Sequence, residues 1–298
     1  MVAPESEFGG LFLMEIYRGC GRGCRFCAAG HLIRPLRHRS AAGVLATVRE
    51  EAPRELERCG ILGSAVADHP DIAGLLKGIL DEGKGLSVSS LRIDRATPEI
   101  LSLLKQGGCR SVTFAPETGS EGLRRAVNKR ITDEEILEAV AATARAGIAG
   151  IKLYFMVGLP GEEKSDRDAV VELLRRCQRR LVSASRSRGR IGTISASISC
   201  FVPKAWTPFQ WHPFAGTSLL KAELSRMSAA ARKIPNVTVR HDSPRSAYVQ
   251  AYLSRADRRG ADTLREVHDN GGSWPKAFRK AEVEPDFFVS RVRDRGEL

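Results

Sequence analysis

The amino-acid sequence predicts an α/β fold, with a partial (β/α)6 TIM-like barrel over residues 1–215 and a small mixed or helical C-terminal subdomain over residues 216–298. Two observations predict this fold. Short apolar runs alternate with helical patterns from Leu11 to about Phe201, which is typical of parallel strands connected by helices. The chain has 298 residues, of which 42% are hydrophobic, so it is long enough to bury a barrel-sized core.

The apolar runs between these limits have the length of strands. We expect them to form the parallel strands Leu11–Ile16, Ile61–Val66, Leu86–Leu91, Ser111–Ala115, Ile151–Val157 and Ile191–Phe201. Beyond them, the sequence predicts a helix over Leu219–Arg232 and a short strand over Val237–Arg240, both within the C-terminal subdomain.

The helices between the strands carry start and stop signals. Thr97 before Pro98 is a cap followed by proline at the first helical position, and Thr132 with Glu135 forms a capping box. Three glycines are expected to end helices in the left-handed conformation: Gly83, Gly107 and Gly147.

Polar and glycine-rich segments follow the ends of the predicted strands, where β/α barrels collect their chemistry. In the last predicted strand, apolar residues alternate with Ser195, Ser197 and Ser199. Because successive side chains point to opposite faces, we expect these serines to line a polar chamber. Glu117 has the inward parity on the fourth strand.

Composition narrows the class of protein. No apolar run approaches the roughly 18 residues of a membrane span, and the N-terminus lacks signal-peptide features, so the sequence predicts a cytoplasmic protein with no membrane association. The net charge of +12 has two interpretations: a nucleic-acid partner, or a solvated helix end formed by the arginine-rich run over residues 175–190. We favour the second, because the run precedes a strand and so lies opposite the polar loops.

Cysteine usage indicates metal binding. Three of seven cysteines lie in the eight residues Cys20–Cys27, a pattern that favours metal over disulfides in a reducing compartment. The others are expected to be ordinary buried residues: Cys59, Cys109, Cys177 and Cys200.

The C-x₃-C-x₂-C spacing of Cys20, Cys24 and Cys27 supplies three thiolates, one fewer than a ferredoxin [4Fe–4S] cluster takes. One iron would therefore be open to a substrate or cofactor. The alternative is a zinc site with His31 as fourth ligand.

This motif, with Phe26 before its last cysteine and a strand before its first, resembles the radical S-adenosylmethionine (SAM) superfamily. Further segments resemble a branch whose members usually carry an N-terminal cobalamin-binding-type domain, which we do not find here: residues 15–20, 34–35, 113–117, 154–162, 201–204 and 253–255. One departure is Gly63-Ser64-Ala65, which stands where the superfamily usually has Gly-Gly-Glu.

The resemblance implies roles for the loop residues. The three cysteines would ligate three irons of a [4Fe–4S] cluster, and the amine and carboxylate of SAM would chelate the fourth. Gly63 and Ser64 would contact the methionine end of SAM. The resemblance further implies that its carboxylate and ribose are held by Ser90, Arg92 and Glu117, and that its adenine is covered by Met156 and Gly158.

Two alternatives remain for these residues. Arg92 is also placed to pair with Asp94 or Glu117, and Gly158–Gly161 is also explained as a tight turn.

The function implied is a radical SAM enzyme that cleaves SAM to a 5′-deoxyadenosyl radical, with a reductant such as flavodoxin or ferredoxin and an unknown substrate, RNA and protein being the classes considered. Two alternatives are a methyltransferase assisted by cobalamin from a separate subunit and a non-catalytic Fe–S binding module. Lys204 and the basic loop over residues 34–39 are candidates to bind an anionic group.

Overall fold

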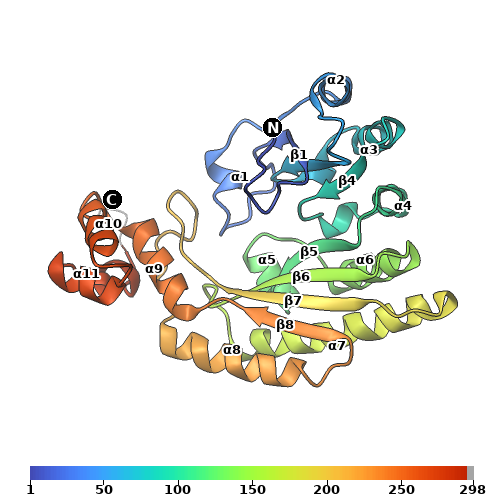
Figure 1. Ribbon diagram of the computed structural model, residues 1–298. Helices are drawn as coiled ribbons and strands as arrows, with labels where there is room; N and C mark the ends of the chain where they lie inside the picture. Colours follow the sequence, from blue (N-terminus) through green and yellow to red (C-terminus); the bar gives the residue numbers. More distant parts are fainter. Residues whose placement is uncertain (294–298) are drawn as a thin grey trace.

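The computed structural model describes residues 1–293 and contains two four-stranded sheets (Figure 1). The first sheet has the order β2-β1-β3-β4. In it β1, β3 and β4 run parallel, while the short β2 pairs antiparallel with β1. Its strands are β1 (Phe12–Arg18), β2 (Arg37–His38), β3 (Arg58–Gly63) and β4 (Gly85–Val88).

The second sheet is wholly parallel, in the order β5-β6-β7-β8. Its strands are β5 (Ser111–Glu117), β6 (Gly150–Val157), β7 (Thr193–Cys200) and β8 (Val237–His241). The two sheets meet only at a parallel bridge between Leu91 and Phe114 among the described residues. The α/β class with parallel strands is therefore present, but one continuous partial barrel is not confirmed, because the strand pairing stops after β4.

The second sheet extends past residue 215, where the sequence predicted the appended subdomain to begin. Strand β8 pairs parallel with β7, with Val237 opposite Ile194. Helix α8 (Thr217–Ala231) connects them, as a parallel crossover requires. The predicted helix and strand both form, and β8 adds a fourth strand to the second sheet.

Helices cover the outer side of both sheets (Figure 1). The main ones are α2 (Ala41–Glu51), α3 (Ile72–Asp81), α4 (Pro98–Gln106), α6 (Asp133–Arg145) and α7 (Lys164–Ser185). Shorter elements lie in the loops: α1 (Ala29–Leu32), α5 (Glu121–Ala126) and the 3₁₀ turns η1 (Val66–Asp68), η2 (Ile93–Arg95) and η3 (Arg186–Arg188).

The helix signals act as predicted, with one correction. The Thr97 hydroxyl accepts a hydrogen bond from the Ile100 amide, and Thr132 and Glu135 form the capping box. Gly83 and Gly147 are left-handed, with φ of 72° and 80°. The prediction for Gly107 is wrong: its φ is −73°, and Gly108, with φ of 79°, makes the reversal. In a Gly-Gly pair either residue can adopt the left-handed conformation, so the sequence alone does not distinguish them.

Burial on β7 follows the predicted alternation. Ile194, Ala196 and Ile198 are buried, while the three serines between them are partly exposed. The four isolated cysteines are all buried and free. Burial raises the pKa of the Cys177 thiol to about 12 and that of Cys200 to about 11, so both stay neutral near pH 7.

The arginine-rich run forms the end of α7 and the turn before β7. Several of its guanidinium groups pair with carboxylates of α6 and α7: Arg175 and Arg179 with Glu172, Arg176 with Asp133, and Arg180 with Glu134. The run thus extends from the beginning of α6, where Arg176 and Arg180 form these pairs, to the end of α6, where Arg188 donates a hydrogen bond to the Arg145 carbonyl oxygen (2.8 Å). This agrees with a solvated helix end.

Four helices follow β8 and gather beside the sheet (Figure 1). They are α9 (Pro244–Arg255), α10 (Gly260–Asp269), α11 (Trp274–Lys280) and α12 (Pro285–Val289). Within the described residues, no helix is both long and apolar enough to cross a bilayer.

A buried arginine connects the loop after β5 to α6. Arg124 is fully buried, donates hydrogen bonds to the carbonyl oxygens of Thr118 (2.8 Å) and Ile131 (2.7 Å), and pairs with Asp133. We predict that Arg124→Ala lowers the free energy of unfolding by about 3 kcal/mol, because each buried acceptor left without a donor costs about 1–3 kcal/mol. Urea denaturation measures this. Arg125→Ala, whose side chain is exposed, is the control; equal effects of the two substitutions would show that Arg124 is not structural.

Candidate functional site

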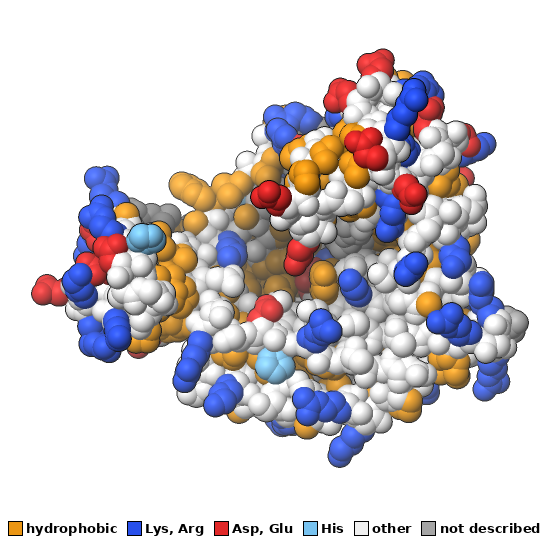
Figure 2. Space-filling model, in the orientation of Figure 1, with side chains coloured by type: hydrophobic (Ala, Val, Ile, Leu, Met, Phe, Trp, Pro, Cys, Tyr) orange, Lys and Arg blue, Asp and Glu red, His pale blue; other side chains and the backbone are white. Residues whose placement is uncertain are grey.

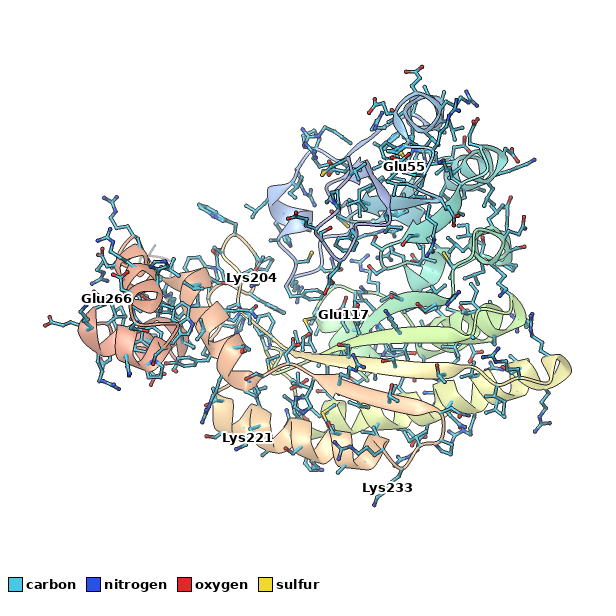
Figure 3. All side chains as sticks on the ribbon, viewed as in Figure 1. Glu55, Glu117, Lys204, Lys221, Lys233 and Glu266 are labelled. Carbon is cyan, nitrogen blue, oxygen red and sulfur yellow. The ribbon has the colours of Figure 1, made fainter. Side chains whose placement is uncertain are left out.

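The three clustered cysteines line one cavity of about 150 Å³ at the carboxyl ends of β1, β3, β4 and β5. Figure 2 shows this part of the molecule hollowed between the first sheet and the second, and Figure 3 shows Glu117 facing it from the second sheet. Of the residues predicted to hold SAM, the cavity wall contains Ser64, Ser90, Arg92 and Glu117. Residues that follow or end three other strands, β3, β4 and β5, therefore converge on the cysteines.

The cysteine loop runs from the end of β1 to α1 and turns at two left-handed glycines, Gly19 (φ 86°) and Gly23 (φ 65°). Cys24 is buried, and Cys20 and Cys27 are partly exposed. Burial is the largest influence on the Cys24 thiol and raises its pKa; the charge of Lys129 opposes this and that of Glu117 adds to it. A metal must therefore displace a proton from Cys24 to bind it.

A segment after α5 holds this loop from the other sheet. The Asn128 side-chain amide donates to the carbonyl oxygens of Arg22 (3.2 Å) and Gly23 (2.9 Å). The Arg25 amide donates to the Val127 carbonyl oxygen (3.0 Å), and the Arg25 guanidinium to that of Ala126 (2.7 Å). We call residues 126–130 the brace. Asn128 has a φ of 58°, a conformation that asparagine tolerates better than most residues.

A charged network fixes the other side of the loop. Arg22 makes two hydrogen bonds to the mostly buried Asp68, at 2.7 Å and 3.0 Å. Arg92 donates to Asp94 at 2.9 Å, and its Nε lies 3.9 Å from Asp68. Burial tends to raise the pKa of Asp94, but the hydrogen bond from Arg92 and the charges of Arg92 and Arg22 outweigh it, so the net pKa is lowered. Arg92 thus pairs with Asp94, one of its two predicted alternatives, and not with Glu117.

Glu117 pairs instead with Lys129, which the sequence analysis did not identify. The Lys129 ammonium lies 2.8 Å from Glu117 Oε1, and the two side chains are only 11% and 13% exposed. The register of β5 and β6 shifts between Phe114 and Glu117, and Glu117 has a φ of 74°. Lys129 was missed because it follows a short helix rather than a strand end, although its neighbour Asn128 marks a turn.

The remaining predicted residues lie outside the cavity wall. A side-chain carbon on Gly63 would lie 2.8 Å from Tyr17 Cβ, so glycine there permits the close approach of β1 and β3. Met156 packs against a small apolar cluster that also contacts Phe26 and consists of Leu123, Val127, Leu159, Phe201 and Phe209. Gly158, with φ of 85°, donates its amide to Glu162 at 2.7 Å, so Gly158–Gly161 does form a tight turn.

The donor set does not suit a single ion. Within residues 1–293, no group of three or more His, Cys, Asp or Glu side chains is placed to hold one metal ion. His31 Nε2 lies 3.0 Å from the Cys24 carbonyl oxygen, which occupies it within the loop. In a four-iron cluster each thiolate binds a different iron, so cysteines spread around one cavity fit a cluster better than the compact tetrahedron of zinc.

The chain is similar in sequence to longer proteins. The chain is 29% identical over 295 residues to an uncharacterized protein of Methanocaldococcus jannaschii, covering 99% of this chain and 62% of that one. It is 25% identical over 180 residues to a tRNA-2-methylthio-N(6)-dimethylallyladenosine synthase of Anaplasma marginale, covering 54% and 38%. The chain thus spans less than two thirds of these relatives.

Solved structures show the same fold at low identity. The methyltransferase TsrM of Kitasatospora setae, with cobalamin and a [4Fe–4S] cluster bound, has a TM-score of 0.52 at 15% identity, covering 91% of this chain and 61% of that one. Streptococcus suis SuiB bound to S-adenosylmethionine has a TM-score of 0.53 at 12% identity, covering 80% and 52%.

The family model for the radical SAM superfamily matches residues 14–174, more than half of the chain. This segment includes the cysteine loop, the brace and the cavity wall that lies between them. The enzymes of this family use a [4Fe–4S] cluster and SAM, and three cysteines line the cavity of this chain. The chain belongs to the radical SAM superfamily.

Proposed function

We propose that this protein is a radical SAM enzyme that holds a [4Fe–4S] cluster through Cys20, Cys24 and Cys27 and cleaves SAM to a 5′-deoxyadenosyl radical. The observation that supports this best is that three thiols from one loop and polar groups from three other loops line a single cavity. When bound and reduced, the cluster supplies the electron that breaks the sulfonium bond of SAM. We further propose that the two sheets form the wall of one open barrel around this cavity.

The cavity wall offers complementary groups for SAM. Arg92 Nε is buried and has no hydrogen-bond partner within the described residues, so it is a donor available to a ligand. A buried donor without a partner is costly, and a bound carboxylate relieves that cost. Lys129 adds a further cation to the cavity lining, beside Arg22 and Arg92. Together with the Ser64 and Ser90 hydroxyls, these groups suit the carboxylate end of SAM.

We assign Glu117 to the ribose hydroxyls, which donate hydrogen bonds to a carboxylate. Its ion pair with Lys129 holds it in a fixed orientation in a largely buried position. We propose that the Gly63 backbone contacts the methionine end of SAM, and that Met156 and Gly158 contact its adenine.

We propose two domains, the core over residues 1–215 and the C-terminal part over residues 216–298, with α8 and β8 contributing to the core sheet.

A second candidate is a methyltransferase that uses cobalamin. The likeness to TsrM with cobalamin bound, over 91% of the chain, favours testing it, although no cobalamin-type domain is evident in residues 1–293. Methyl transfer that depends on added cobalamin would distinguish this activity from SAM cleavage without cobalamin.

The relative named as a tRNA-modifying synthase and the precursor-peptide complex of SuiB support RNA and protein as substrate classes. The reductant, of the flavodoxin or ferredoxin type, is likewise proposed.

We predict that the protein reconstituted anaerobically is brown and holds about four irons per chain. Cys24→Ala should lose the cluster, because it removes one of only three ligands. Iron analysis and the visible absorption spectrum measure both. Cys177→Ala is the control, since that thiol is buried on α7 away from the loop. A colourless wild-type protein with one zinc would contradict the proposal.

We predict that Glu117→Gly keeps the cluster but weakens SAM binding about 10- to 150-fold, the equivalent of roughly 1.5–3 kcal/mol for a hydrogen bond to a charged group. Glycine is chosen because it accepts the left-handed φ of this position, where alanine would add strain. Titration of SAM into both reconstituted proteins gives the two affinities. If they match, Glu117 serves only as the partner of Lys129.

A further inference from the structure

We propose that the surface formed by residues 32–37 docks an acidic electron-carrier protein of the flavodoxin or ferredoxin type, and that the electron enters the cluster at Cys20. We call this segment the entry surface. The inference rests on the proposed function, because it assumes a cluster at the three cysteines.

The first observation is that Cys20 lines two spaces. It lies in the wall of the inner cavity with Cys24 and Cys27. It also lies in a second pocket of about 520 Å³, which opens outward and is lined by Cys20, Gly21, Arg34, Pro35 and Leu36. Because electron transfer slows steeply with distance, a thiolate that separates the cluster from an outward pocket offers a short route.

The entry surface lies directly on the cysteine loop. A side-chain carbon on Gly19 would be 2.3 Å from the Ile33 carbonyl oxygen and 3.5 Å from the Leu36 Cα. Arg34 Nε donates to the Gly30 carbonyl oxygen at 2.8 Å. Between a partner that contacts Leu36 and the cysteine loop there is therefore only the backbone of the entry surface itself.

The entry surface is apolar and basic. Leu32, Ile33 and Leu36 are 53%, 38% and 42% exposed. In Figure 2, hydrophobic side chains gather at the surface around α1, with Lys and Arg side chains near them. Arg34 and Arg37 are exposed, and neither lies within 4.0 Å of a carboxylate among the described residues, although the charge of Arg37 contributes to lowering the pKa of Glu15. By contrast, the arginines at the end of α7 pair with carboxylates.

An apolar centre with basic groups around it matches the interface of a transient complex with an acidic protein. An anionic substrate fits the charge equally well, but it has to reach SAM in the inner cavity, whereas this pocket leads to Cys20 from outside. The electron-carrier protein is therefore the occupant that the geometry favours. In each encounter the reduced carrier gives up one electron, and the oxidised cluster takes it up; no bond forms or breaks at Cys20.

The test uses reconstituted protein and pre-reduced flavodoxin under anaerobic stopped-flow conditions, with loss of cluster absorbance as the signal. Arg37→Glu and Arg34→Glu are expected to slow reduction by flavodoxin about tenfold or more, since electrostatic steering changes association rates by about 10 to 10³. Reduction by dithionite, a small donor, should stay unchanged. Arg179→Glu, which makes the same charge change at the end of α7, is the control.

Equal flavodoxin rates for the Arg37→Glu, Arg179→Glu and wild-type proteins would overturn the inference. Loss of binding to labelled tRNA with flavodoxin kinetics unchanged would also overturn it and assign the surface to an anionic substrate. Arg34→Glu removes the hydrogen bond to the Gly30 carbonyl oxygen and could for that reason fail to take up iron. In that case the flavodoxin rate of Arg37→Glu alone tests the inference. A wild-type protein without a four-iron cluster would overturn the proposed function itself, which the iron analysis detects separately.

Discussion

The site depends on the hydrogen bonds between the brace and the cysteine loop. The loop leaves β1 in the first sheet, and the brace follows β5 and α5 in the second. Within residues 1–293 the two sheets share a single bridge, between Leu91 and Phe114. Asn128 meets two demands at once. It adopts a left-handed backbone and donates two N–H groups to loop carbonyls. Glycine would satisfy only the first demand, and glutamine would donate but resist the conformation.

The charge distribution around the cavity follows from this arrangement. Arg22, held by Asp68, and Arg92, held by Asp94, bring positive charge to one wall, while the Lys129 and Glu117 pair forms the other. Each of these three cations has a carboxylate partner, namely Asp68, Asp94 and Glu117. Buried pairs of this kind contribute little net stability but fix side-chain orientation, which is what a polar cofactor requires.

Local sequence signals predicted several features of the fold and of the candidate site. The caps at Thr97 and Thr132, the alternation along β7 and the spacing of the three cysteines each depend on neighbours within a few residues, and the first two are confirmed. Other features depend on contacts across the fold. The pairing of Lys129 with Glu117, the brace at Asn128 and the addition of β8 to the second sheet join segments that no local pattern connects. The left-handed residue after α4 is Gly108 and not the predicted Gly107, because either glycine of the pair can adopt that conformation.

The most direct test of the central claim is SAM cleavage by the reduced protein. The reconstituted wild-type chain is incubated anaerobically with SAM and dithionite, and the nucleoside products are separated and quantified. With the three cysteines holding a cluster beside a SAM-binding wall, the expected result is 5′-deoxyadenosine and methionine in equal amounts, with neither from Cys24→Ala. Intact SAM in the presence of a fully loaded, reduced cluster, or S-adenosylhomocysteine as the only nucleoside product, would contradict this function.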